Sequence, residues 1–242
     1  MQDRKLLHLW MVIIISQLFM TLNAQNEVDP QLTAKPIGIV WQSKHHYPGS
    51  EFLFEDWMPG EIHLNNGQIV KNIQLNYNAY SDALIYAAGG MTPVETSKYH
   101  VKAFRVSTRQ GKRFFILSDF DAHLRADNED RQFYELLYDG SNRFYAKRSK
   151  KINKSLVNDN PFKKSVYYRD DEYLINIKGD WLTRPQKPAS YYPYYEKSLV
   201  KNIIRKNRLS LKREEDLVRF LSELDELSKT LPASETKNPV NP

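Results

Sequence analysis

The chain of 242 residues contains no cysteine. Without thiols it can form no disulfide, bind no metal through thiolates and use no cysteine nucleophile. It also lacks the cysteine to which a bacterial lipoprotein attaches its lipid. If the first 24 residues are a leader that is removed, as we predict below, about 218 residues remain. That length is sufficient for a hydrophobic core that needs no covalent cross-links.

Short motifs of well-known catalytic sites are also missing. The sequence has no Gly-x-Ser-x-Gly, no His-Glu-x-x-His and no phosphate-binding loop. We therefore predict no catalytic residue and no cofactor. Hydrolysis by a pair of carboxylates stays open, because the separation of two acidic residues in sequence does not give their separation in space.

The one long apolar run lies near the N-terminus. Arg4 and Lys5 precede an apolar stretch over residues 6–22, and the small residue Ala24 precedes Gln25. These are the three parts of a secretory signal, so we predict a signal peptide over residues 1–24 and export to the periplasm or the cell exterior. An uncleaved membrane anchor is the alternative, but the run is short for a span and polar chain follows it at once.

From residue 37 to residue 180 short apolar segments alternate with turn residues, which is typical of antiparallel strands. The clearest hairpin joins residues 60–64 to 68–77 through Asn66-Gly67, a pair that suits the positive φ angles of tight turns. Its buried face is predicted to carry Ile69, Ile73, Leu75 and Tyr77, with Val70 on the wetter face.

Two further hairpins are predicted, one joining residues 100–108 to 112–117 and one joining 132–138 to 143–148. Both faces of 114–117 and of 133–138 are apolar or aromatic, so these strands should be central and covered on both sides. Residues 173–178 form a further strand. The pattern predicts an antiparallel meander, rolled or sandwiched.

After residue 180 the apolar spacing becomes helical. Pro193 is placed in the first turn of a helix whose apolar stripe is Tyr195, Leu199, Val200, Ile203 and Ile204. A second helix begins near Glu214 and carries Leu217, Phe220, Leu221, Leu224 and Leu227 on one face. The predicted fold is thus α+β and mostly β. Its parts are a lead-in (25–36), a β domain (37–180), a connector with a helical pair packed on the sheet (181–231) and a disordered tail (232–242).

A resemblance to a known family rests on several short segments. They are Asp56-Trp57-Met58-Pro59-Gly60-Glu61-Ile62, Asn66-Gly67, Leu75-Asn76-Tyr77-Asn78 and Phe133-Tyr134-Glu135-Leu136-Leu137-Tyr138-Asp139-Gly140. With the paired helices, these segments resemble an uncharacterised family of small secreted β-rich proteins common in Bacteroidota. The resemblance implies export and supplies no mechanism.

Charge is distributed unevenly along the chain. Residues 25–140 have a net charge of −4 and residues 141–242 a net charge of +9. A dense basic run, interleaved with Phe144 and Tyr145, supplies the candidates for anion binding: Arg143, Lys147, Arg148, Lys150, Lys151 and Lys154. In an exported protein an anionic envelope polymer is favoured over nucleic acid as the partner. A strand end whose charges are simply solvated is favoured over either partner.

Two groups of polar residues could hold a metal. An acidic loop contains Asp119, Asp121, His123, Asp127, Glu129 and Asp130, but it lacks the glycine and the distal glutamate of a calcium loop. His45 and His46 are adjacent and point opposite ways in an extended chain. We predict no metal site in either group.

Aromatic residues are concentrated near the connector. Tyr191, Tyr192, Tyr194 and Tyr195 follow Trp181, and Tyr167 and Tyr168 could lie close to them. Such a group could stack on sugars, but it more often packs helices onto a sheet.

The sequence therefore favours an exported, non-enzymatic binding or structural protein of the cell envelope, with an anionic polymer or another envelope protein as its partner. A glycan or peptide hydrolase and a carrier of lipid or another hydrophobic ligand are the alternatives. Two convergent, desolvated carboxylates in a cleft would favour the hydrolase, and a long apolar groove would favour the carrier.

Overall fold

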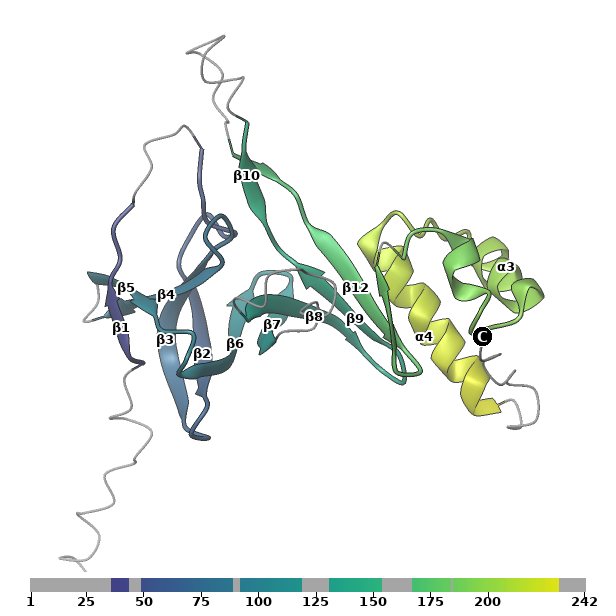
Figure 1. Cartoon of the computed structure of the whole chain (residues 1–242), viewed down its shortest axis with the longest axis horizontal. Helices are drawn as coiled ribbons and strands as arrows, with labels where there is room; N and C mark the ends of the chain where they lie inside the picture. Colours follow the sequence, from purple (N-terminus) through teal and green to yellow (C-terminus); the bar gives the residue numbers. More distant parts are fainter. Residues whose placement is uncertain are drawn as a thin grey trace, which may run out of the picture.

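The computed structural model of the chain describes residues 36–43, 49–88, 92–118, 131–153, 167–183 and 185–230. Within them, an open antiparallel sheet of 11 strands has the order β1-β5-β4-β3-β2-β6-β7-β8-β9-β12-β13 (Figure 1). The strands are β1 (Gly38–Val40), β2 (Met58–Leu64), β3 (Ile69–Asn78), β4 (Ala83–Ala88), β5 (Thr92–Thr96), β6 (Val101–Thr108), β7 (Gly111–Ser118), β8 (Gln132–Asp139), β9 (Arg143–Lys147), β12 (Glu172–Ile177) and β13 (Asp180–Thr183). Together with two C-terminal helices, this sheet confirms the predicted α+β, mostly β fold.

The sheet grows in two directions from β2. Consecutive hairpins lead from β2 to β5 on one side, and β6 then returns to pair with the other edge of β2. From β6 to β9 each strand pairs with the next one along the chain, on the side of β2 opposite to β3. All three predicted hairpins are present.

One face assignment in the first hairpin is wrong. Between Gly60 and Ile62 the register of β2 against β3 shifts, because β3 inserts an extra residue around Asn72, whose φ is 56°. This bulge displaces the alternation by one position. Val70 therefore joins the core, while Ile69 is only half-buried and lies outside it.

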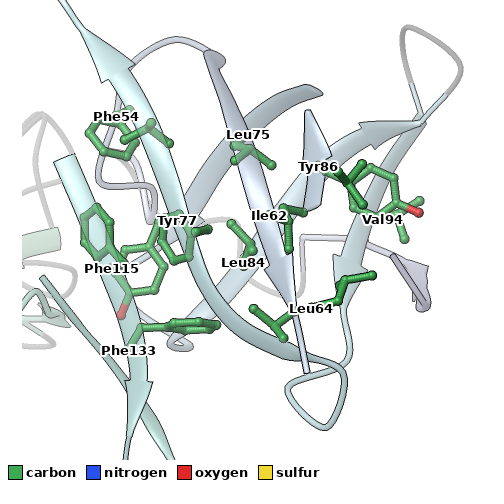
Figure 2. Packing of buried hydrophobic residues seen from close by; sticks show 14 of the residues in the cluster. Phe54, Ile62, Leu64, Leu75, Tyr77, Leu84, Tyr86, Val94, Phe115 and Phe133 are labelled. Carbon is green, nitrogen blue, oxygen red and sulfur yellow. The ribbon is translucent and has the colours of Figure 1, made fainter. Parts of the chain in front are cut away.

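The first core lies on the inner face of β2 to β8, where the curved strands surround their own aromatic rings (Figure 2). Phe104 and Phe115 stack with their ring centroids 4.5 Å apart, and Tyr77 and Phe133 pack against Phe104 at 6.0 and 5.1 Å. All four side chains are fully buried. The interior of the curve is thus filled by side chains.

The second core lies between the helices and the end of the sheet formed by β8, β9 and β12. Helices α3 (Lys197–Lys206) and α4 (Glu214–Thr230) bury their predicted apolar residues there, except that Tyr195 of the first stripe precedes α3, and the 3₁₀ helix η2 (Pro188–Tyr191) adds the buried Tyr191. Pro193 does not open α3 as predicted. It lies in a turn closed by hydrogen bonds from the Tyr194 and Tyr195 amides to the Tyr191 carbonyl, and Pro188 begins η2 instead.

The central strands are covered on both faces, as expected. Phe133 belongs to the first core, while Tyr134 faces the other way and packs with Tyr145 and Leu174 in a third cluster. Both Phe133 and Tyr134 are fully buried. No helix within the described ranges is long and apolar enough to cross a membrane.

Beyond the sheet, β9 and β12 continue as a two-stranded ribbon of β10 (Lys150–Ile152) and β11 (Tyr167–Arg169). Figure 1 shows this ribbon projecting from the sheet. We call residues 143–153 and 167–177 the arm. The pairing is interrupted at Arg148-Ser149 and Asp170-Asp171, and this interruption shapes the site described next.

Candidate functional site: the charged junction at Arg148

Arg148 lies where the arm leaves the sheet, between the first and second cores. In β9 the side chains of Phe144 and Ala146 face the cores, and Arg148 follows on the same side because strand side chains alternate. Its side chain is 2% exposed. A cation is thus placed at a position that the strand pattern reserves for an apolar residue.

Three carboxylates surround this guanidinium. Nε of Arg148 donates to Glu135 Oε2 at 2.5 Å, and Nη1 donates to Asp171 Oδ2 at 2.8 Å. Glu214 accepts from Nη1 and Nη2 at 2.7 and 2.9 Å in a paired geometry. The ligands come from β8, from the interruption in the arm and from the start of α4, so Arg148 joins all three elements.

Two outer arginines complete the charge balance. Arg113 donates to both oxygens of Glu135 at 2.5 and 2.6 Å, and Arg169 donates to Asp171 at 2.5 Å. The junction therefore holds three guanidinium groups and three carboxylates. Such matching is needed, because an uncompensated buried charge costs several kcal/mol.

The electrostatics of the junction keep Glu214 and Arg148 ionised. Burial alone would raise the pKa of Glu214, but the hydrogen bonds and charge of Arg148 outweigh it and hold that pKa below the usual 4.5. Desolvation would lower the pKa of Arg148, but the surrounding carboxylates raise it. Glu214 is therefore a carboxylate at neutral pH and not a general acid.

A shallow cleft of about 700 Å³ lies over the junction. Its lining consists of Arg169, Asp170, Asp171, Tyr173, Arg213, Glu214 and Glu215. Asp171 and Glu214 converge here, as a carboxylate hydrolase would require. Their oxygens, however, face Arg148 and Arg169. The arrangement fits an ion-paired structural joint better than an acid–base pair.

A second polar cluster attaches α4 to the turn between β8 and β9. Asp225 accepts from the Tyr138 hydroxyl at 2.8 Å and from the Asn142 side-chain amide at 2.6 Å. Burial, followed by the nearby Asp225, raises the pKa of Tyr138 to about 12. A Cβ on Gly140 would lie 2.1 Å from an Asp225 oxygen. The turn must therefore carry glycine for the helix to approach this closely.

The predicted anion-binding residues are not brought together. The exposed Arg143 pairs with Asp139 at 3.0 Å, the exposed Lys151 pairs with Asp170, and Lys147 is half-buried. Nζ of Lys150 donates to the Ser50 and Phe52 carbonyls at 2.8 and 2.5 Å, and burial lowers its pKa.

Arg148 differs from the other candidates, because its side chain is buried and carboxylates of the same chain occupy its donors. Lys154 lies outside the described residues. Arg143 and Lys151 are thus exposed cations in surface ion pairs, whereas Arg148 and Lys150 bind groups of the same chain in less exposed positions.

The tyrosines near the connector also separate. Tyr191 is buried in the second core and donates to the Pro185 carbonyl at 2.8 Å, with Tyr192, Tyr194 and Tyr195 half-buried around it. Trp181 packs instead on Tyr145, at a centroid distance of 5.9 Å, in the third cluster. These rings pack the protein and form no shared platform.

Sequence reasoning missed the three acidic partners of Arg148. Glu135 alternates with apolar neighbours inside β8, and a lone acid in such a strand signals a buried ion pair. Asp171 and Glu214 carry no comparable signal. The acidic loop, His45, His46 and the tail from residue 232 lie outside the described residues. Within the described part of the chain, no group of three metal-ligating side chains comes together.

Comparison of the chain with protein-family models, with curated proteins and with solved structures finds no match. The resemblance to secreted Bacteroidota proteins therefore stays a prediction.

Proposed function

We propose that the protein is an exported, non-enzymatic binding or structural component of the cell envelope. The observation that carries this proposal is the use of charge at the junction. Arg148 binds Glu135, Asp171 and Glu214 at 2.5–2.9 Å and so joins the sheet, the arm and α4 into one frame. Charged groups that hold a scaffold together support a binding or structural role.

Export is supported by the basic start, the apolar run and the small residue before Gln25. In an oxidising compartment a cysteine-free chain depends on non-covalent joints alone. The junction and the Asp225 cluster are two such joints, and both fix α4 to the sheet.

The two alternatives receive less support from the geometry. For a hydrolase, one carboxyl must keep a proton near neutral pH, whereas Arg148 lowers the pKa of Glu214. For a hydrophobic carrier, the curved sheet would have to enclose ligand space, whereas Phe104, Phe115, Tyr77 and Phe133 fill its interior.

The test follows the full-length chain, carrying a C-terminal tag, in its native cells. We expect recovery in the envelope fraction, an N-terminus at Gln25, and release from that fraction by high salt without detergent. Recovery in the cytoplasm, or an intact Met1 chain that resists carbonate extraction, would contradict the proposal.

An activity screen addresses the hydrolase directly. The purified mature chain and its Asp171→Asn variant are incubated with envelope glycan and peptide fractions, and products are followed by mass spectrometry. The proposal predicts no turnover by either chain. Turnover by wild type that is abolished in an Asp171→Asn variant still folded by circular dichroism would establish the hydrolase instead.

A further inference from the structure

A second basic segment lies in the helical region, at the opposite end of the sheet order from β1. Residues 197–213 contain seven lysines and arginines and no acidic residue. We define the basic helix face as the six of these side chains that belong to α3 and the connection after it, without Arg213: Lys197, Lys201, Arg205, Lys206, Arg208 and Lys212. All six are exposed. Figure 1 shows α3 on the outer side of the helical pair.

The position of these cations follows from the amphipathic pattern of α3. Val200 and Ile203 are buried in the second core and hold the helix in place. Lys197, Lys201 and Arg205 recur every four residues on the outer side. With a rise of 1.5 Å per residue they are spaced by about 6 Å along the axis. The result is a linear row of positive charge on a fixed support.

The charges on this face are not neutralised as those at Arg148 are. Arg205 donates to the side chain of Asn202 at 3.2 Å, and Nζ of Lys197 lies 5.7 Å from the Tyr192 ring centroid. No member of the face makes an ion pair with a carboxylate among the residues that the structure describes. Arg213, just beyond the face, does make one, with Asp216 at 2.6 Å.

Arg208 provides an independent observation. Its φ of 51° places it in the left-handed region, directly after Asn207, the C-cap of α3. The Leu209 amide donates a hydrogen bond to the Ile204 carbonyl at 2.9 Å, and the Arg208 amide donates one to the Arg205 carbonyl at 3.3 Å. This is the helix-ending motif in which glycine is strongly preferred. The chain instead places a cation there, in a backbone conformation that disfavours it.

We propose that the basic helix face binds a linear anionic polysaccharide. The inference deepens the proposed function and rests on it for the location of the polymer. A row of evenly spaced, exposed cations matches an extended, hydrated polyanion better than a small ligand.

Two other polyanions fit the face less well. A helix that binds a bilayer surface inserts large apolar side chains. The large hydrophobic residues that are exposed in the described ranges all lie outside α3: Ile37, Ile39, Val40, Trp57, Tyr80, Tyr99 and Tyr168. Single-stranded nucleic acid stacks its bases on free aromatic rings. Tyr192, the ring beside the face, is half-buried and lies beneath Lys197.

The experiment measures binding of the mature chain to fluorescent heparin, used as a model sulfated polysaccharide, at low salt. The test variant carries Lys201→Gln, Arg205→Gln and Lys206→Gln. A matched control carries Arg143→Gln, Lys147→Gln and Lys151→Gln, which removes the same charge from the arm. Circular dichroism checks that both variants stay folded.

We expect the test variant to bind heparin at least about tenfold more weakly, because each contact that is lost leaves on the polymer a counterion that binding would otherwise release. We expect the affinity of the control to stay within about twofold of wild type. An equal loss in both variants, a loss in the control alone, or no binding by wild type would overturn the proposal. So would tighter binding to anionic phospholipid vesicles or to an oligo-dT strand than to heparin.

The two proposals fail separately. If heparin binding is absent while the chain is still recovered in the envelope fraction, the polysaccharide inference falls and the proposed function stands. If the chain is recovered in the cytoplasm while heparin binding depends on α3, the proposed function falls and the face remains a polyanion site in vitro.

Discussion

The arm and the basic helix face start from similar sequences and reach opposite states. Residues 143–154 contain six cations and residues 197–213 contain seven. In the arm, Arg148 is buried among carboxylates, while Arg143 and Lys151 pair with nearby acids. On α3 the cations are exposed and make no such pairs among the described residues. The number of cations in a segment of sequence thus does not tell how many of them are accessible to a partner.

The difference arises from the periodicity of the two elements. In a strand, alternate residues face the core, so a basic run must turn some of its cations inward. Arg148 follows Phe144 and Ala146 in this way. In a helix, an apolar stripe can be kept separate from the charged arc. The stripe of Val200 and Ile203 faces the second core and leaves every cation of α3 outside.

The largest expected effect comes from breaking the arm's internal neutralisation. Arg148→Met should lower the free energy of unfolding by about 3–5 kcal/mol, because three carboxylates lose their common partner. Urea denaturation measures the change. Arg143→Met, at an exposed pair, should change it by less than about 0.5 kcal/mol. Equal effects of the two substitutions would show that Arg148 is not the central joint.

Weakening the second core, on which α3 and α4 pack, should lower the free energy of unfolding by nearly as much. Leu221 is fully buried in the second core, so Leu221→Ala should lower the free energy of unfolding by about 2–5 kcal/mol. The measurement is a denaturation midpoint with unchanged slope. A midpoint equal to that of wild type would mean that the helices are detached from the sheet and that the basic face has no fixed support.

Acidification should weaken the junction. The pKa of Glu214 is held below 4.5 in the folded chain, so its contribution is fully present above that value and is lost as pH falls through the folded-state pKa. The stability difference between wild type and Glu214→Gln should therefore shrink on acidification below about pH 4.5. Glu215→Gln, at the exposed neighbour, is the control. A difference that persists or grows toward low pH would contradict the ion pair.

The smallest expected effect is that of a substitution at Arg208, which should raise the stability of the fold and lower the affinity for heparin. Arg208→Gly should raise the free energy of unfolding by about 0.5–1 kcal/mol, because glycine relieves the left-handed conformation. The same substitution should weaken heparin binding. Denaturation and binding are measured on the same preparation. A variant that is more stable and binds equally well would remove Arg208 from the face.

The sequence predicts the strands, hairpins and helices well because their signals are local. Asn66-Gly67 marks a turn, and the spacing of Leu217, Leu221 and Leu224 marks a helix face. The bulge at Asn72 was missed because an inserted residue leaves the apolar composition unchanged. The junction was missed because its acids lie 13, 23 and 66 residues from Arg148. Pairing over such distances depends on the assembled sheet, which no local pattern encodes.

The central claim is that cations of the arm bind groups of the same molecule, whereas those of α3 form no ion pair with a carboxylate of the described residues. The most direct test is the slope of log affinity for heparin against log salt concentration, which counts the cations that displace counterions. Replacing Lys201, Arg205 and Lys206 with Gln should reduce this slope by about 2–3, at roughly 0.7–0.9 per lost contact. Replacing Arg143, Lys147 and Lys151 should leave it unchanged. A slope that falls equally for both variants, or only for the arm variant, would contradict the account.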